Sequence, residues 1–200
     1  MNKKIQTLIF TSALLLFLSS PSIAVIDDYQ GAVDAYSRED YKTAYELMLP
    51  LAEKGFAKAQ YNLGLMYGKG KGVNRDYKEA VRWYLRAAEK GYSKAQTNLG
   101  WMYEKGKGVP RDDQKAAKWY QLASDQGVAK AQYNLGLMYG RGKGIVKDDS
   151  KAVKWWKLAA DQGDGKSQTN LGWMYEKGRG VNQDDQEAIK WYRLASDQGF

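Results

Sequence analysis

Residues 56–91 read FAKAQYNLGLMYGKGKGVNRDYKEAVRWYLRAAEKG, and this pattern returns three more times at a spacing of 36 residues. The tripeptide Asn62-Leu63-Gly64 recurs at 98–100, 134–136 and 170–172. A fixed period of this length is the mark of a repeat architecture. The chain therefore divides into four units, at about 56–91, 92–127, 128–163 and 164–199.

Each unit is predicted to be a hairpin of two helices. In the first unit, a helix over 58–67 is followed by glycines at 68, 70 and 72, which end it and supply turn conformations. Asp76 is the expected N-cap of the second helix, and Glu79 would complete a capping box. Gly91 ends that helix.

Apolar residues at helical spacing predict which faces are packed. In the first unit they are Ala59, Leu63, Met66 and Tyr67 on the first helix, and Ala80, Tyr84, Ala87 and Ala88 on the second. Gly64 has no side chain, so a neighbouring helix can approach closely there. One tryptophan of the second helix is the same in every unit, and we expect all four copies in the core: Trp83, Trp119, Trp155 and Trp191.

The composition excludes several kinds of catalytic site. The chain of 200 residues has no Cys and no His, so it cannot form a Ser-His-Asp triad, a Cys-His pair or a zinc site of nitrogen and sulfur ligands. A hydrolase that uses carboxylates alone, or a Ser-Lys pair, remains open. We predict no metal or other cofactor, and a chain that binds rather than catalyses.

Two motifs suggest chemistry but fit structural roles better. The stretch 140–144, Gly-Arg-Gly-Lys-Gly, resembles a phosphate loop, yet it follows a helix and lacks the Gly-Lys-Ser/Thr ending. We therefore expect a turn. The aspartate pairs at 112–113, 148–149 and 184–185 could act as paired carboxylates. They stand where the second helices begin, so capping explains them better.

The pattern Ala-x-x-x-Leu-Gly-x-x-Tyr, Gly-x-Gly-Val and Ala-x-x-Trp-Tyr-x-x-Ala-Ala-x-x-Gly resembles the Sel1-like repeat, a relative of the tetratricopeptide repeat. The resemblance covers 56–199. It implies an all-α fold, a right-handed α-solenoid of paired helices with the first helix of each pair on the concave side. It also implies scaffold or adaptor work in bacterial envelopes. Some disulfide-bridged relatives are linked to β-lactam binding and hydrolysis, but this chain lacks their cysteines.

Both ends of the repeat array differ from the four units. Residues 41–55 align with the second helix of the repeat by the same offset, and 28–38 would be a divergent first helix. Residues 25–55 are therefore predicted to be a degenerate N-terminal capping repeat. At the other end, the sequence stops at Phe200, where the next first helix would begin. The last helix would then expose a packing face, which suggests self-association of the C-terminal repeat as one outcome.

Residues 1–24 have the pattern of a secretory signal peptide. Lys3 and Lys4 precede an apolar stretch over 5–18, and Ser22-Ile23-Ala24 is a small-x-small cleavage site. We therefore expect cleavage after Ala24 and a periplasmic or secreted protein. The remainder has 29 basic and 23 acidic residues. This excess is compatible with anionic partners, but a solvated helix exterior is the preferred explanation of the charge.

The first helices alternate in sequence, with units one and three alike and units two and four alike. The differing positions are i, i+4 and i+7, so they share one helix face, which is expected to face the concave groove. They are Tyr61, Leu65 and Gly68, then Thr97, Trp101 and Glu104, then Tyr133, Leu137 and Gly140, then Thr169, Trp173 and Glu176.

This face supplies the candidate binding residues. Trp101 and Trp173 are the predicted aromatic anchors, with packing between repeats as the alternative. Tyr61 and Tyr133 add amphipathic area. Four asparagines beside the face could pair with a peptide backbone or with groups of their own repeat: Asn62, Asn98, Asn134 and Asn170.

Three functions compete on this evidence. The first is a protein–protein interaction scaffold that holds a protein or peptide in the groove. The second is an envelope protein that binds acidic polysaccharide or peptidoglycan, and the third is a β-lactamase-like hydrolase. Nucleic acid is not an expected partner, because the predicted signal peptide directs the chain away from it.

Overall fold

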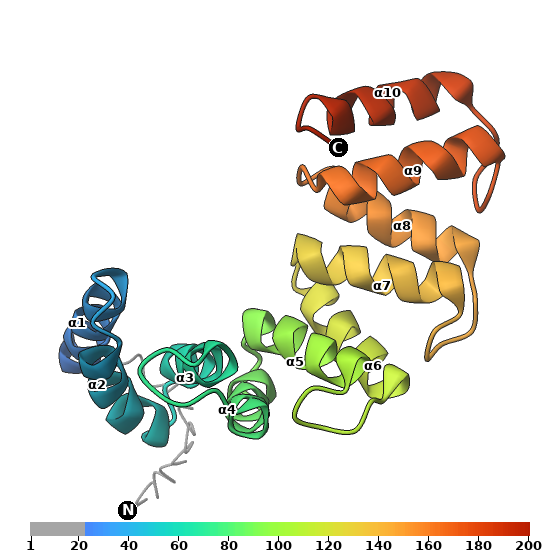
Figure 1. Ribbon diagram of the computed structural model, residues 1–200. Helices are drawn as coiled ribbons and strands as arrows, with labels where there is room; N and C mark the ends of the chain where they lie inside the picture. Colours follow the sequence, from blue (N-terminus) through green and yellow to red (C-terminus); the bar gives the residue numbers. More distant parts are fainter. Residues whose placement is uncertain (1–22) are drawn as a thin grey trace, which may run out of the picture.

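The computed structural model describes residues 23–200, and their regular secondary structure consists of ten α-helices (Figure 1). This confirms the all-α solenoid predicted from the sequence. The helices are α1 Ile23–Ser37, α2 Tyr41–Glu53, α3 Ala57–Lys69, α4 Tyr77–Glu89, α5 Ser93–Lys105, α6 Asp113–Asp125, α7 Ala129–Arg141, α8 Asp149–Ala160, α9 Gly165–Lys177 and α10 Asp185–Ser196.

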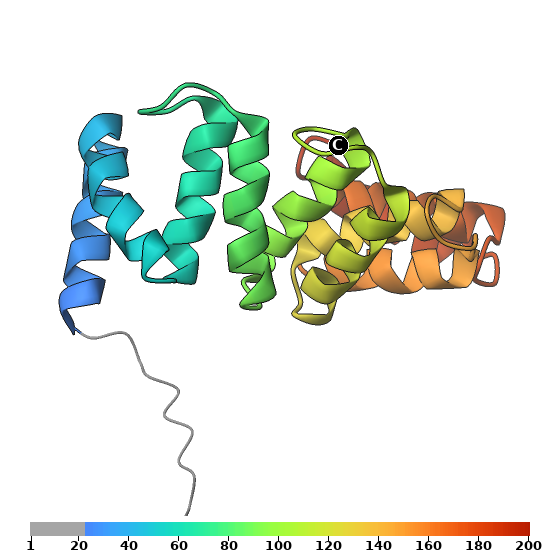
Figure 2. The ribbon, with the colours of Figure 1, turned by 90° about the horizontal axis from the view of Figure 1, so that it is seen from below.

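The helices stack in chain order, each against the one before and the one after it. We call the first helix of each 36-residue unit an A helix (α3, α5, α7, α9) and the second a B helix (α4, α6, α8, α10). The stack is curved, so the N-terminal and C-terminal repeats form two arms with a bend between them (Figures 1 and 2). Among residues 23–200, no helix combines the length and apolarity that a membrane crossing requires.

The helix ends are set by the residues that the sequence indicated, with one correction. The B helices begin at Asp76, Asp112, Asp148 and Asp184, whose carboxylates accept backbone N–H bonds of the first turn. The capping box predicted with Glu79 is not formed. The backbone N–H of Asp76 instead donates to the carbonyl of Tyr67 at 3.0 Å, and Glu79 pairs with Arg82.

The glycine-rich stretches are turns, as expected. The A helices end at left-handed residues with φ between +59° and +68°: Gly70, Gly106, Gly142 and Gly178. Two residues later, another glycine packs on the start of the helix that precedes this A helix. A Cβ on Gly108 would lie 2.2 Å from the carbonyl oxygen of Tyr77, so only glycine fits there. The turn therefore locks one repeat onto the previous one.

Within a repeat, the A and B helices meet at a glycine and an aromatic ring. A Cβ on Gly64 would lie 2.5 Å from the ring of Tyr84. The same contact recurs three times, in the pairs Gly100 and Tyr120, Gly136 and Trp156, and Gly172 and Tyr192. The close approach predicted at Gly64 is thus confirmed, and an aromatic side chain makes it.

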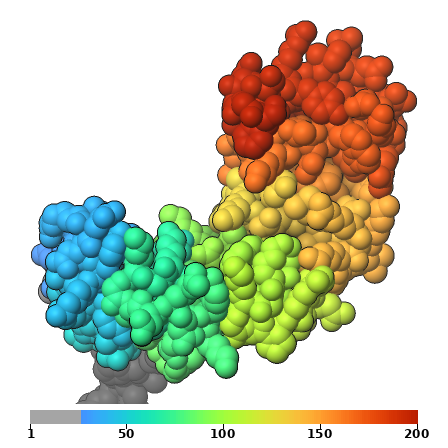
Figure 3. Space-filling model, viewed as in Figure 1, coloured from blue at the N-terminus to red at the C-terminus, as the bar shows by residue number. Residues whose placement is uncertain are grey.

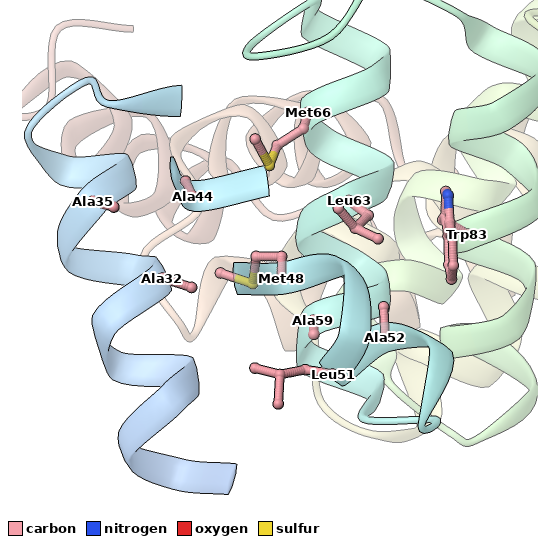
Figure 4. Packing of buried hydrophobic residues seen from close by; sticks show 10 residues of the cluster. All are labelled: Ala32, Ala35, Ala44, Met48, Leu51, Ala52, Ala59, Leu63, Met66 and Trp83. Atoms are coloured by element: carbon pink, nitrogen blue, oxygen red, sulfur yellow. The ribbon is translucent and has the colours of Figure 1, made fainter. Parts of the chain in front are cut away.

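Between repeats, the B-helix tryptophans fill the core. Trp83, on α4, joins the buried cluster formed by α1, α2 and α3 (Figure 4). Trp155 and Trp191 are buried in the next clusters along the chain. The core position predicted for these residues holds for three of them, whereas Trp119 is only partly buried.

A ladder of glutamines joins successive repeats and was not anticipated. In each A helix a buried glutamine donates to a carbonyl near the end of the preceding helix, as Gln96 does to Ala88 at 3.1 Å. A second glutamine, Gln126, then donates to Gln96 Oε1 at 2.7 Å. This pairing recurs between Gln162 and Gln132 and between Gln198 and Gln168.

The segment before the repeats also forms a helical pair. The helices α1 and α2 pack on each other and on α3, and they supply Ala32, Ala35, Ala44 and Met48 to the first core cluster (Figure 4). The predicted signal peptide, residues 1–24, lies outside the described residues except for its last two, which begin α1.

Candidate functional site

A groove of about 830 Å³ runs along the A helices on the hollow side of the bend (Figure 3). We call it the inner groove. It crosses α3, α5 and α7 and reaches the start of α9. Its apolar and aromatic lining consists of Leu65, Tyr77, Tyr84, Trp101, Met102, Tyr133, Leu137, Met138 and Phe200, and its uncharged polar lining includes Asn98 and Asn134.

Helix periodicity explains why the A helices can serve both the core and the groove. In α3, Leu63 and Met66 are buried, whereas Leu65 is only half-buried and lines the groove. In α7, Leu135 is buried and Leu137 lines the groove in the same way. One stripe of each helix therefore holds the repeats together, while the next stripe is left to face the hollow side.

The inner groove brings together half of the residues predicted for the binding face. Seven of the fourteen line it: Leu65, Asn98, Trp101, Glu104, Tyr133, Asn134 and Leu137. The other seven lie outside its lining: Tyr61, Asn62, Thr97, Thr169, Asn170, Trp173 and Glu176.

Some of the residues outside the lining are engaged in the fold itself. The ring of Tyr61 packs against the rings of Tyr84 and Tyr92, with centroids 5.9 and 5.2 Å apart. Asn62 donates to the hydroxyl of Tyr29 at 2.9 Å. This partner belongs to α1 and not to the repeat of Asn62, so the bond is internal to the protein but is not the bond within one repeat that was the alternative.

The two threonines differ from the expectation of an open face. Thr97 is buried, and its hydroxyl donates to the carbonyl of Ser93 at 2.9 Å. Thr169 is exposed but makes the same bond within its helix, to Gly165 at 3.0 Å. A hydroxyl bonded to the preceding turn has used its donor, so neither threonine offers one to a ligand.

The two predicted anchors have different surroundings. Trp101 lines the groove, is partly buried between two core clusters and carries Lys107 Nζ 4.8 Å from its ring centroid. Trp173 is 40% exposed, lies outside the groove lining and has the guanidinium of Arg179 at 5.0 Å. In both cases a cation covers one face of the indole.

The alternating glutamates have a partner inside their own repeat. Glu104 accepts from the hydroxyl of Tyr120 at 2.9 Å, and Glu176 accepts from Tyr192 at 2.8 Å. In unit three the corresponding aromatic is Trp156, and glycine stands at 140, where an added Cβ would lie 3.2 Å from the indole. The alternation that we assigned to recognition is therefore in part a packing requirement.

Glu104 is also the centre of a charged cluster between repeats two and three. Lys143, from the turn of the next repeat, lies 3.3 Å from Glu104 and 3.5 Å from Asp113, and Lys105 lies 2.8 Å from Glu104. Burial acts to raise the pKa of Glu104, but hydrogen bonds from Lys105 and Tyr120 and the charge of Lys143 bring it below its usual value. This carboxylate is thus held in its charged form at the groove wall.

The amides on the groove floor have capacity for a ligand. Among residues 27–200, Asn134 and Asn170 have no hydrogen-bond partner for their side chains, unlike Asn62. Asn134 lines the groove and Asn170 does not. An amide offers two donors and an acceptor, so Asn134 can pair with either half of a peptide group.

The basic residues of the groove lining were not among the binding residues predicted from the sequence. Five groove residues belong to two rows of basic side chains on the A helices, namely Lys69, Lys105, Lys130, Arg141 and Lys166. The signal was available, because every unit has a basic residue near each end of its first helix. The net charge of the whole chain conceals it.

The acidic pairs behave as caps and ion pairs. Asp112, Asp148 and Asp184 cap B helices, while Asp113 pairs with Arg111 and Asp149 with Arg179. Among residues 23–200, no three acidic side chains come together in a way that could hold a metal ion.

Comparison with known proteins identifies the repeat. The family model described as the Sel1 repeat matches 57–92, 93–128, 129–164 and 165–200. The chain belongs to the Sel1 repeat family. Sel1 repeat proteins generally bind protein partners and serve as scaffolds, typically without catalysis.

Solved structures of two other Sel1-type proteins are similar to this chain. A protective antigen of uropathogenic Escherichia coli with an SLR fold is 37% identical, with a TM-score of 0.84, over 88% of this chain and 38% of the antigen. A Sel1 repeat protein from Oxalobacter formigenes is 34% identical, with a TM-score of 0.82, over 86% of this chain and 71% of that protein. This chain thus spans well under half of the antigen's length. A search of curated proteins gave no match.

Proposed function

We propose that this Sel1 repeat protein is a non-catalytic scaffold of the bacterial envelope or secreted space, and that it holds a segment of a partner protein in the inner groove. The predicted signal peptide over 1–24 supports the location. The general role of Sel1 repeats as interaction scaffolds supports the type of partner.

One observation carries the choice of the groove. Leu65, Trp101, Asn134 and Leu137 come from three different A helices, yet they converge on one concave surface of about 830 Å³. Each of them lies beside a buried residue of the same helix, so the core is complete without their full burial. A concave surface with apolar area and a few polar groups is the usual form of a binding site.

The groove can be tested by blocking it. Asn134→Trp would place a large uncharged side chain on the groove floor, whereas Asn170→Trp makes the same change at the equivalent position of the next repeat, outside the lining. Peptides of 16 residues selected from a random display library on the unmodified chain are the probe. We expect Asn134→Trp to lose their binding and Asn170→Trp to keep it.

The two tryptophans provide a second matched pair. Trp101→Ala should weaken binding of the selected peptides by tenfold or more, a typical loss at a central aromatic anchor, while Trp173→Ala should leave it within about twofold. Circular dichroism and thermal unfolding check that both variants are folded. Equal effects of the two substitutions would contradict the assignment of the inner groove.

Carbohydrate binding is the second candidate, and one observation favours it. Trp173 is 40% exposed, and an exposed indole can stack on a sugar ring. Because Arg179 covers one face of this ring at 5.0 Å, only the other face is open. The test is a pull-down of the protein on purified peptidoglycan. If the unmodified chain binds and Trp173→Ala does not, carbohydrate binding is supported over protein binding.

A further inference from the structure

The positive charge of the protein is concentrated on the A helices. These four helices carry eight basic and two acidic side chains. The rest of the described chain carries 21 basic and 21 acidic side chains, because 29 of the 31 basic residues and all 23 acidic ones follow residue 22. The excess of six positive charges over residues 23–200 therefore lies entirely on the helices that line the groove.

The eight basic residues form two rows. One row stands at the second residue of each A helix, and its members are Lys58, Lys94, Lys130 and Lys166. The other stands at the last residue of each A helix, and its members are Lys69, Lys105, Arg141 and Lys177. Within an A helix the two rows are eleven residues apart, which is about 16 Å at the rise of an α-helix.

Most of these cations are not neutralised by the protein. All eight are exposed. Only Lys105 and Lys177 have an ion pair within residues 27–200, each with the glutamate that precedes it. The other six are left to solvent, and five of the eight line the inner groove.

Local helix energetics do not explain the first row. A lysine in the first turn of a helix opposes the helix dipole, whose positive end lies there. The fold nevertheless repeats this arrangement in all four A helices. This unfavourable interaction with the helix dipole is small at an exposed site. The lysines contribute nothing to the core, however, so core packing does not explain them.

From these observations we infer that the inner groove binds an acidic polypeptide segment, with its carboxylates along the two basic rows and an apolar side chain on the floor between them. This inference rests on the proposed function and specifies the partner. Complementary charge favours such a segment and accelerates its association. The apolar floor of Leu65, Met102 and Leu137 suits a peptide side chain.

The surroundings of the tryptophan favour a peptide over an acidic polysaccharide. Sugar stacking needs an open aromatic face, and the groove tryptophan, Trp101, is partly buried with Lys107 Nζ 4.8 Å from its ring centroid. Asn134, in contrast, offers two donors and an acceptor at the groove floor, which matches a peptide backbone.

The test compares two variants that remove the same charge. Lys130→Gln with Arg141→Gln removes one cation from each row of the groove. Lys118→Gln with Lys154→Gln removes two exposed cations from B helices, outside the inner groove. Affinities for the tightest selected 16-residue peptide are measured by fluorescence anisotropy at 50 and 300 mM NaCl.

We expect the selected peptides to be enriched in Asp and Glu. The groove pair should weaken binding roughly tenfold at low salt and by less at high salt, and the B-helix pair by no more than about twofold. Circular dichroism and thermal unfolding show that both variants are folded.

Three results would overturn the inference. If the peptides lack acidic enrichment and the two pairs act alike, but Asn134→Trp still blocks binding, the groove function stands and the acidic partner is wrong. If Asn134→Trp has no effect, the proposed function fails as well. If polygalacturonate displaces the peptide at equal carboxylate concentration, the groove binds anionic polymers regardless of backbone, and the commitment to a polypeptide is wrong.

Discussion

The ladder of glutamine hydrogen bonds is incomplete at Gln60. This glutamine donates to the carbonyl of Ala52 at 2.9 Å, like its counterparts, but its own Oε1 is buried without a partner. In the later repeats a glutamine fills that role, as Gln126 does for Gln96. The equivalent position after Gln60 is occupied by Lys90, which makes no such bond. A buried acceptor without a donor is a cost to the folded state.

Lys90→Gln should therefore stabilise the protein. The new amide would donate to Gln60 Oε1 and complete the ladder, which predicts a gain of about 1 kcal/mol in the free energy of unfolding. Urea unfolding followed by circular dichroism measures it. The reverse change, Gln126→Lys, should lower stability by a similar amount, and a stabilising effect of that variant would contradict the role of the ladder.

Two helical glycines should respond to alanine with opposite signs. Gly64→Ala would place a Cβ 2.5 Å from the ring of Tyr84, so we expect a loss of about 1 to 3 kcal/mol from overpacking. The nearest atom to a Cβ on Gly31 is Leu47 Cδ1 at 3.9 Å. Gly31→Ala should therefore stabilise by up to about 1 kcal/mol through helix propensity. Thermal unfolding of both variants distinguishes the signs.

The burial of single residues could not be predicted from the sequence where it depends on neighbouring repeats. Trp101 and Trp173 share one motif, and so do Thr97 and Thr169, yet their burial differs because each meets a different part of the array. The glutamine ladder had a signal, an unchanged glutamine at 60, 96, 132 and 168. A polar residue that is the same in every repeat can be either buried or exposed. The structure was therefore needed to show that these glutamines are buried and bonded.

At the scale of elements, the positions of the helices were predicted more accurately than the roles of single residues. Glycine positions, aspartate caps and apolar spacing located every helix of the four units, since local geometry dictates these features. The capping box at Glu79 failed because the turn before α4 folds back, and the carbonyl of Tyr67 takes the N–H of Asp76. The four-residue pattern that predicts a capping box contains no information on such a contact across the turn.

The junction between repeats two and three should be sensitive to acid. The pKa of Glu104 is lower in the folded protein than its ordinary value of 4.5, so the folded state is favoured while the carboxylate is charged. This contribution is present above pH 4.5 and is lost as the pH falls through the lowered pKa.

The comparison of Glu104→Gln with the unmodified chain tests this. The unmodified chain should be the more stable at pH 7, and the difference should shrink as the pH is lowered from 5 to 3. Urea unfolding at each pH measures it. A difference that is constant with pH would show that the charge of Glu104 does not contribute.

At the scale of the whole molecule, the most extensive helix–helix contacts in the described chain run between successive helices. Each core cluster is shared by adjacent repeats, as when Trp83 of α4 completes the cluster of α1 to α3. Stability in such an array is a sum of repeat and interface contributions. The same repetition brings equivalent residues of successive A helices side by side, and five of the eight basic residues of the two rows line the inner groove.

A core truncation should therefore act locally. Leu135, in α7, is 1% exposed, and Leu135→Ala is expected to cost about 2 to 5 kcal/mol. Hydrogen exchange followed by mass spectrometry should show faster exchange in α6, α7 and α8 and little change in α1 and α2. An equal acceleration along residues 27–200 would indicate one cooperative unit instead.

The most direct test of the inner groove is a crystal structure of the chain with its tightest selected peptide. We predict a peptide that lies across α3, α5 and α7, with a carboxylate within ion-pair distance of Lys130 or Arg141 and an apolar side chain against Leu137. A peptide bound instead to the exposed leucines of the B helices, Leu122, Leu158 and Leu194, would contradict the account.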